Sequence, residues 1–460
     1  MRRRFSPLIL FIILGVCVLL MGFESGVGAL GYRCLERGEA GKALELFAST
    51  NNFSGMGLTY CYFKHFDMAI DSFAKVNDYS GIGLAYCGKK DFDTAISYFE
   101  KKKDYSGIGL AYCGKRDFKK AREYFARVND WSGYGLAFLG EKRYDEAINS
   151  FKQKGDLSGL GLAYCGKKDF HTAIAYFEKV NDLSGLGLAY LGLNDPQTAI
   201  DKFTQANDKS GLGLAYLQLK DYARAENYFQ QANDLSGLGL LYLDKKEYDK
   251  AIDAFRRTND RSGLGLAYLS MNRINEAIEY FKQANDKSGL GLAYEKAKMH
   301  KEAIANFKAA NDSEGLGDVY YSLHSYDKAF ACFDKSYSYV KAIQALREKK
   351  DFEKAIFYGE GLIAKGISSD QIRISLAEVY ADNDDMDKAL ELLDQAERNP
   401  LFYAQANLLK GKLCFREEDY QKSKEALQSV ITYSPESQWA EIAKSGLKDI
   451  EFLESLVVKK

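Results

Sequence analysis

The side chains that could carry out chemistry are few and scattered along the 460 residues of this chain. Its four histidines, His65, His171, His300 and His324, are far apart in sequence, and no Ser-His-Asp or paired-acid arrangement accompanies them. The eight cysteines include no C-x-x-C pair and no cluster with histidine at metal-ligand spacing. We therefore predict no catalytic residue, no metal site, no cofactor and no small-molecule substrate, and a protein that is not an enzyme.

A packing role accounts for the cysteines. Four of them directly follow a tyrosine in one recurring motif: Cys61, Cys87, Cys113 and Cys165. Other copies of the motif have leucine in that position: Leu191, Leu217, Leu243 and Leu269. A position that alternates between cysteine and leucine is typical of a small apolar packing site. We predict buried thiols and no structural disulfide.

The composition excludes two classes of protein. Apolar residues make up 46% and charged residues 28%, with a formal net charge of -1, so the pattern indicates neither a disordered tail nor a nucleic-acid-binding surface. The chain also has 40 glycines and 32 tyrosines but only 4 prolines. Such a combination indicates a periodic origin for the glycines rather than a large number of turns.

The period is 26 residues. Ser-Gly dipeptides follow one another at this spacing without a slip, starting at Ser54, Ser80, Ser106, Ser132, Ser158, Ser184, Ser210, Ser236, Ser262 and Ser288. Diverged copies extend the frame, so we predict about thirteen such repeats over residues 28–365. The Gly-x-Gly of each repeat, as in Gly81 and Gly83, falls inside a predicted helix, which excludes the strand-turn-helix context of a dinucleotide site.

Each repeat is predicted to hold two short helices. Asp78 and Asp91 are natural N-caps, which places a first helix at about 79–87 and a second helix from Phe92 onward. Gly88 and Asn77 stand where helices commonly end in a left-handed residue. The second helix keeps Ala95, Ile96 and Phe99 on one face, with charged residues on the other, so it is expected to be the outer, amphipathic helix.

These positions resemble a known family. Gly83, Tyr86, Ala95 and Phe99, together with Val76 of the preceding repeat, fall at the relative spacings of the tetratricopeptide repeat. The family's usual period is 34 residues, and that spacing appears near the end of the chain, where Ala355, Ala389 and Ser423 follow one another by 34. The resemblance implies an all-α solenoid used for protein-protein contact, with normal-length repeats and a capping helix over residues 366–456.

The first helices carry no charged side, and two interpretations stay open. Their glycines suggest close approach of neighbouring backbones, and hence a tightly wound superhelix filled along its axis. The alternative is an open groove with an apolar floor that binds an apolar segment. Both concern one row of leucines: Leu84, Leu110, Leu136, Leu162, Leu188, Leu214, Leu240 and Leu266.

The last repeats differ, because charged residues take the positions that face the groove in the family. These are Glu378 and Asp382, then Lys412 and Arg416. We predict a candidate protein-binding groove at these four residues. The alternative is that they are solvated charges on helix faces.

The N-terminus carries a membrane signal. Residues 1–4 include three arginines, and an uncharged, mostly apolar run follows from Phe5 to Phe23. That length suffices to cross a bilayer, so we predict a transmembrane anchor over residues 5–23 with a basic cytoplasmic stub at residues 1–4. Signal cleavage after Ala29, which would secrete the protein, and lipidation at Cys17 are the alternatives.

Together these features predict a membrane-anchored repeat scaffold that lies outside the cytoplasm, in a bacterial periplasm or at the cell surface, and organises other proteins. The alternative function is a structural rod or fibre subunit built by stacking of the near-identical repeats. Protein partners or self-assembly are expected, whereas a nucleic-acid partner is not. The identity of the partner, the organism and the oligomeric state are not readable from the sequence.

Overall fold

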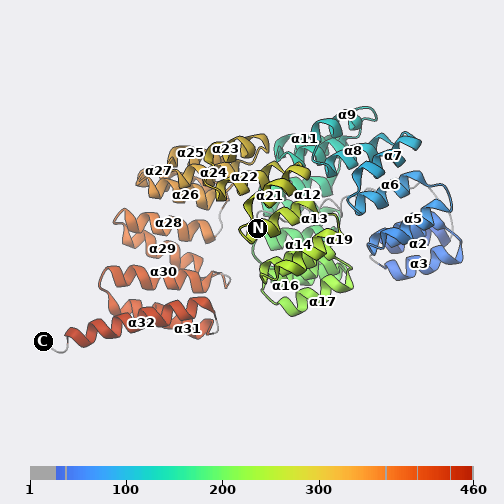
Figure 1. Ribbon diagram of the computed structural model, residues 1–460. Helices are drawn as coiled ribbons and strands as arrows, with labels where there is room; N and C mark the ends of the chain where they lie inside the picture. Colours follow the sequence, from blue (N-terminus) through green and yellow to red (C-terminus); the bar gives the residue numbers. More distant parts are fainter. Residues whose placement is uncertain (1–26, 37–38, 368–369, 401, 436, 458–460) are drawn as a thin grey trace. The chain divides into compact units, whose positions relative to one another are not determined.

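The computed structural model describes residues 27–36, 39–367, 370–400, 402–435 and 437–457. Within these residues the chain forms 31 α-helices and no β-strand (Figure 1). By compactness it divides into unit 1, which ends at Asp312, and unit 2, which begins at Ser313. The all-helical solenoid predicted from the repeats is therefore confirmed.

Each repeat consists of a first helix and a second helix. The first helices of unit 1 are α2 (Val27–Glu36), α4 (Phe53–Tyr62), α6 (Tyr79–Gly88), α8 (Tyr105–Gly114), α10 (Trp131–Gly140), α12 (Leu157–Gly166), α14 (Leu183–Gly192), α16 (Lys209–Gln218), α18 (Leu235–Asp244), α20 (Arg261–Ser270) and α22 (Lys287–Lys296). The second helices of unit 1 are α3 (Ala40–Ser49), α5 (Phe66–Ala74), α7 (Phe92–Lys102), α9 (Phe118–Ala126), α11 (Tyr144–Lys154), α13 (Phe170–Lys179), α15 (Pro196–Gln205), α17 (Tyr222–Gln231), α19 (Tyr248–Arg257), α21 (Ile274–Gln283) and α23 (His300–Ala309).

Unit 2 continues the alternation and ends in a long single helix. Its helices are α24 (Ser313–Ser322), α25 (Tyr326–Lys335), α26 (Tyr339–Glu348), α27 (Phe352–Ala364), α28 (Asp370–Asp382), α29 (Met386–Ala396), α30 (Tyr403–Arg416), α31 (Tyr420–Tyr433) and α32 (Gln438–Val457). From α2 to α26, each first helix starts 26 residues after the previous one, and the later steps are longer. The predicted boundary between short and normal-length repeats at residue 365 stays a prediction.

Local capping fixes the ends of the helices. In the repeat that holds α6 and α7, the Asp78 carboxylate accepts from the backbone N–H of Gly81 at 2.9 Å, and Asp91 accepts from that of Thr94 at 3.3 Å. Asn77 is left-handed, with φ of 52°, as predicted. The prediction for Gly88 is wrong, because this residue is helical and the left-handed residue of that turn is Lys90, with φ of 58°.

Glycine is needed at position 88 for a different reason. A Cβ there would lie 2.3 Å from the ring of Phe66, which is closer than atoms can approach without a shift. The ring of the preceding repeat's second helix therefore occupies the space that a side chain would take.

The core of the 26-residue repeats is a ladder of phenylalanines, one from each second helix from α3 to α25. Those less than 2% exposed are Phe47, Phe73, Phe99, Phe125, Phe151, Phe177, Phe203, Phe229, Phe255, Phe281, Phe307 and Phe333. Phe99 shows the arrangement: a Cβ on Gly83 would lie 2.7 Å from its ring, and one on Gly107 would lie 2.4 Å away. The Gly-x-Gly motif thus seats two aromatic rings, whereas the sequence had suggested contact between backbones.

The first helices form the inner wall of unit 1. Neighbouring first helices contact one another, and each second helix packs against its own first helix and the next. Along the predicted leucine row, Leu110 and Leu214 are only 8% and 5% exposed, and the others are half-buried. This row is neither a fully exposed groove floor nor a uniformly closed core.

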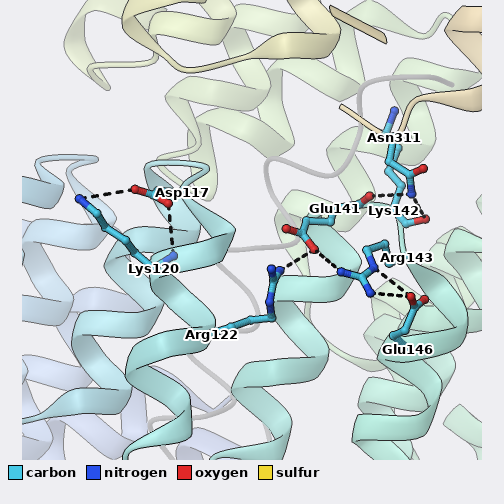
Figure 2. A network of polar contacts seen from close by, with 8 residues as sticks. All are labelled: Asp117, Lys120, Arg122, Glu141, Lys142, Arg143, Glu146 and Asn311. Carbon is cyan, nitrogen blue, oxygen red and sulfur yellow. Dashed lines mark hydrogen bonds and ion pairs between the residues drawn. The ribbon is translucent and has the colours of Figure 1, made fainter. Parts of the chain in front are cut away.

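Successive superhelical turns of unit 1 touch each other through the connections between helices. Lys64 Nζ lies 2.8 Å from Asp234 Oδ2, and Asn233 donates to the Lys64 carbonyl oxygen, 169 residues away, at 3.3 Å. Figure 2 shows another such contact, in which the Asn311 side chain donates to the carbonyl oxygens of Glu141 at 3.2 Å and Lys142 at 3.4 Å. The winding predicted for the superhelix is therefore tight enough for direct contact between turns.

The predicted transmembrane helix and the location derived from it require correction. Among the residues that the structure describes, no helix is both long enough and apolar enough to cross a bilayer, because the apolar first helices are short and the longest helix, α32, is strongly charged. The segment at residues 5–23 and the stub at residues 1–4 lie outside the described residues. The fold is thus an all-α solenoid, and a membrane-anchored, extracytoplasmic location is not supported.

Candidate protein-binding surface

The four side chains predicted to form a protein-binding groove lie on two consecutive first helices of unit 2. Glu378 and Asp382 belong to α28, and Lys412 and Arg416 belong to α30. Arg416 Nη1 donates to Asp382 Oδ1 at 3.3 Å, and its Nη2 donates to the carbonyl oxygen of Ala381 at 2.5 Å. The structure thus joins the charges of the two helices, whereas their binding of a protein stays a prediction.

A fifth residue, Arg347 of α26, completes this surface. Its Nε donates to Asp382 Oδ2 and its Nη1 to Glu378 Oε2, both at 2.6 Å. The sequence interpretation missed Arg347, although a signal exists in the repeat frame: it occupies the position that is Cys87 in an earlier repeat. We call Arg347, Glu378, Asp382, Lys412 and Arg416 the charged ladder, because they connect three successive first helices.

Burial and pairing shape the protonation of the ladder. Burial raises the pKa of the Glu378 carboxyl above its usual range, and Asp382 adds to this effect, while Arg347 opposes it. Burial works against the charged guanidinium of Arg347, but the hydrogen bond with Asp382 and the nearby Glu378 outweigh it, so the pKa of Arg347 is raised. Arg347 therefore stays charged and holds the two carboxylates in place.

The cations of α30 are the exposed end of the ladder. The Arg416 side chain is 43% exposed and Lys412 is also exposed, whereas the side chains of Arg347 and Asp382 are each 28% exposed. Within the ladder three cations accompany two carboxylates. Arg416 also pairs with the neighbouring Glu417 at 3.5 Å, so the positive charge that faces solvent is mainly that of Lys412. This arrangement favours contact with an acidic group of another molecule.

Replacing Arg347 with methionine is expected to loosen the ladder while keeping the apolar stem. Without the guanidinium, Glu378 and Asp382 lose their shared partner, so the pKa of Glu378 should rise further and unfolding of unit 2 should become easier by about 1 kcal/mol, a value reduced for partial exposure. Carboxyl NMR titration and hydrogen exchange over α26–α28 measure both effects.

Lys349→Met supplies a control for the loss of surface ion pairs, because Lys349 pairs with the exposed Asp327 at 2.7 Å and with Asp351 at 3.4 Å. This control should leave hydrogen exchange in unit 2 unchanged. If Arg347→Met also left the Glu378 titration unchanged, Arg347 would not be the group that organises the ladder.

The cysteines that the sequence assigned to packing do lie in packed positions. Cys61, Cys87 and Cys113 are buried, at 8%, 3% and 5% exposed, and Cys165 is half-buried. Burial raises the pKa of the Cys165 thiol to about 12 and that of Cys113 further still. Since the thiolate is the nucleophilic form, these two thiols are unreactive near neutral pH.

Unit 2 also has an open groove between α30, α31 and α32. It is lined by Tyr403, Lys424, Glu425, Gln428, Ser429, Thr432, Tyr433, Leu447 and Glu451. The Tyr403 and Tyr433 rings lie 4.4 Å apart, and the Tyr433 hydroxyl donates to the Pro400 carbonyl oxygen at 3.2 Å. This lining combines both charges with apolar rings, so it favours no particular kind of ligand.

Family models match three segments of the repeat region. A tetratricopeptide repeat model matches residues 374–437, which contain four of the five ladder residues, and a second model of that family matches residues 211–237 and 263–286. No curated protein matches this chain.

Solved structures resemble the chain only in general arrangement. Yeast Tom70 is 13% identical, with 75% of this chain and 97% of that chain covered and a TM-score of 0.39. The Cut9-Hcn1 hetero-tetramer of APC/C is 15% identical, covers 96% and 98% of the two chains and has a TM-score of 0.35. Human IFIT1 is 17% identical, with 70% and 94% covered and a TM-score of 0.34. Similarity at this level says nothing about what this chain binds.

Proposed function

We propose that this chain, whose repeats match tetratricopeptide repeat models, is a non-enzymatic scaffold that binds another protein along the charged ladder of unit 2. The observation that carries this proposal is the exposure of Lys412 and Arg416 on α30, next to carboxylates that Arg347 holds in place. We further propose that the partner contributes an acidic segment, since the solvent-facing charges of the ladder are positive.

The absence of enzymatic activity belongs to the same proposal. Its support is chemical: the sequence pairs no histidine with a nucleophile, and the Cys113 and Cys165 thiols have raised pKa values. A scaffold needs no such groups, because it acts by holding its partner in place.

A photo-crosslinking residue at position 412 tests the scaffold proposal in the organism's own cells. We expect it to capture a protein that the same residue at position 388 does not capture. Lys388 lies on the second helix α29 and is similarly accessible, with its side chain 52% exposed. Introducing Arg416→Glu beside the crosslinker should weaken capture about tenfold or more, because a repulsive pair replaces an attractive one.

An Asp/Glu-rich peptide should reduce crosslinking of the captured protein at position 412, because it competes for the charged ladder. A Lys-rich peptide of equal length should not reduce it. Equal labelling from positions 412 and 388, or capture that Arg416→Glu leaves unchanged, would exclude the charged ladder as the binding surface.

A further inference from the structure

The contact between superhelical turns of unit 1 uses the same chemistry four times. We distinguish the intra-repeat turn, between the two helices of a repeat, from the inter-repeat turn, which leads to the next repeat. A cation of an intra-repeat turn pairs with an aspartate of an inter-repeat turn in the pairs Lys64–Asp234, Lys90–Asp260, Arg116–Asp286 and Lys142–Asp312. The asparagine before each aspartate, Asn233, Asn259, Asn285 or Asn311, donates to a backbone carbonyl oxygen of the same intra-repeat turn.

Each repeat orients its own aspartate as the N-cap of the following helix. Asp260, for example, accepts from the backbone N–H of Gly263 at 2.9 Å as the N-cap of α20, and Lys90 Nζ reaches it at 2.5 Å from the other turn. Burial acts to raise the pKa of Asp260, but Lys90 and the Gly263 N–H outweigh it, so the pKa is lowered and the carboxylate stays charged. The turn-to-turn contact is thus a charge-assisted bond at a capped helix terminus.

The equivalent aspartates of the earlier repeats have no such cation from another superhelical turn among the ion pairs of the described residues. Asp234 and Asp260 are 6% and 8% exposed, whereas Asp78, Asp130 and Asp182 are only half-buried. They keep the rest of the arrangement: Asp130 accepts from Gly133 N–H at 2.9 Å and from the Ser106 hydroxyl at 2.8 Å, and the left-handed Asn129 precedes it. One edge of unit 1 therefore presents formed but uncovered inter-repeat turns.

The later repeats present the complementary edge. Lys220, Lys246 and Lys298 occupy the left-handed position that Lys64 and Lys90 occupy in their intra-repeat turns. The covered side chains of Lys64 and Lys90 are 14% and 23% exposed, whereas Lys246 and Lys298 are exposed. Lys220 is 61% exposed but already pairs with Asp244 of the next first helix at 2.5 Å. Lys246 and Lys298 are two repeats apart, which is also the separation of Asp78 and Asp130.

We propose that a second copy of this chain docks on unit 1 through the same kind of contact that joins the turns within one copy. Lysines of the later intra-repeat turns of one copy, such as Lys246 and Lys298, would pair with aspartates of the earlier inter-repeat turns of the next copy, such as Asp78 and Asp130. The two edges differ, so the contact is heterologous and each copy keeps one edge open for a further copy. Self-association then extends the superhelix in one direction. This inference does not depend on the charged ladder of unit 2 or on its partner.

Sedimentation velocity of the full chain over a range of concentrations and salt tests the proposal. The parent protein should associate with rising concentration, and salt should weaken the association because the docking edges are exposed charges.

A first variant, Lys246→Asp with Lys298→Asp, should weaken association about tenfold or more. Asp tolerates the left-handed backbone at these exposed positions, so the fold should be kept, as hydrogen exchange can verify. Lys350→Asp, at an exposed left-handed turn of unit 2, is the matched control and should associate like the parent.

Exchanging the charges of the two edges distinguishes specific docking from non-specific association. A second variant, Asn77→Lys and Asp78→Asn combined with Asn129→Lys and Asp130→Asn, replaces the negative charge of both turns with a positive one. Lysine is native at the equivalent left-handed Lys103, and asparagine is the native helix cap at the equivalent Asn52. Each variant alone should stay largely monomeric, whereas an equal mixture should recover heteromeric association between acidic and basic edges. A parent that stays monomeric at every concentration, or a mixture that recovers nothing, would overturn the proposal.

Discussion

Phe177→Ala is expected to be the most damaging single truncation in the repeats, at about 3–5 kcal/mol. The Phe177 side chain is fully buried, and its ring lies against Gly161 of its own repeat and Gly185 of the next. Alanine would leave a ring-sized void between two first helices, which glycine backbones cannot fill. Because repeats depend on their neighbours for stability, the loss should appear as faster hydrogen exchange from α12 to α15.

Phe357→Ala is the control for this prediction. Phe357 lies on α27 and is 82% exposed, so its truncation should change stability by no more than about 0.5 kcal/mol. If the two truncations changed protection equally, the phenylalanine ladder would not be the core of the solenoid.

Gly161→Ala is expected to destabilise unit 1, against the usual preference of helices for alanine. At an exposed helical position this change stabilises by about 1 kcal/mol. Here the new Cβ would lie 2.4 Å from the ring of Phe177, which is itself fully buried and cannot move away freely. Overpacking of this kind costs about 1–3 kcal/mol, so the net effect should reverse in sign.

Gly361→Ala provides the matched comparison, because a Cβ at this helical glycine of α27 would meet nothing within 4 Å. Hydrogen exchange should show slower opening around position 361 and faster opening around position 161. The same gain at both positions would contradict the role of Gly161 as the seat of an aromatic ring.

The sequence by itself determined the repeat and its local structure. Asp78, Asp91 and Asn77 took the predicted capping roles, because an N-cap or a left-handed helix end depends on residues a few positions away. The inward face of Ala95 and Phe99 followed from helical periodicity for the same reason, and both residues are fully buried. The charges of the ladder on α28 and α30 were also visible as departures from the apolar pattern.

Only the tertiary structure decided which groups from distant positions meet. Gly88 and the Gly-x-Gly motif proved to seat phenylalanine rings, a contact with neighbouring helices that helix propensity does not encode. Arg347 joined the ladder because α26 packs beside α28, across more than 30 residues of sequence. The contact between turns, such as Lys90 with Asp260, arises from a small rotation added at every repeat over 170 residues. Sequence spacing fixes each repeat, but that summed rotation is set by side-chain packing between repeats.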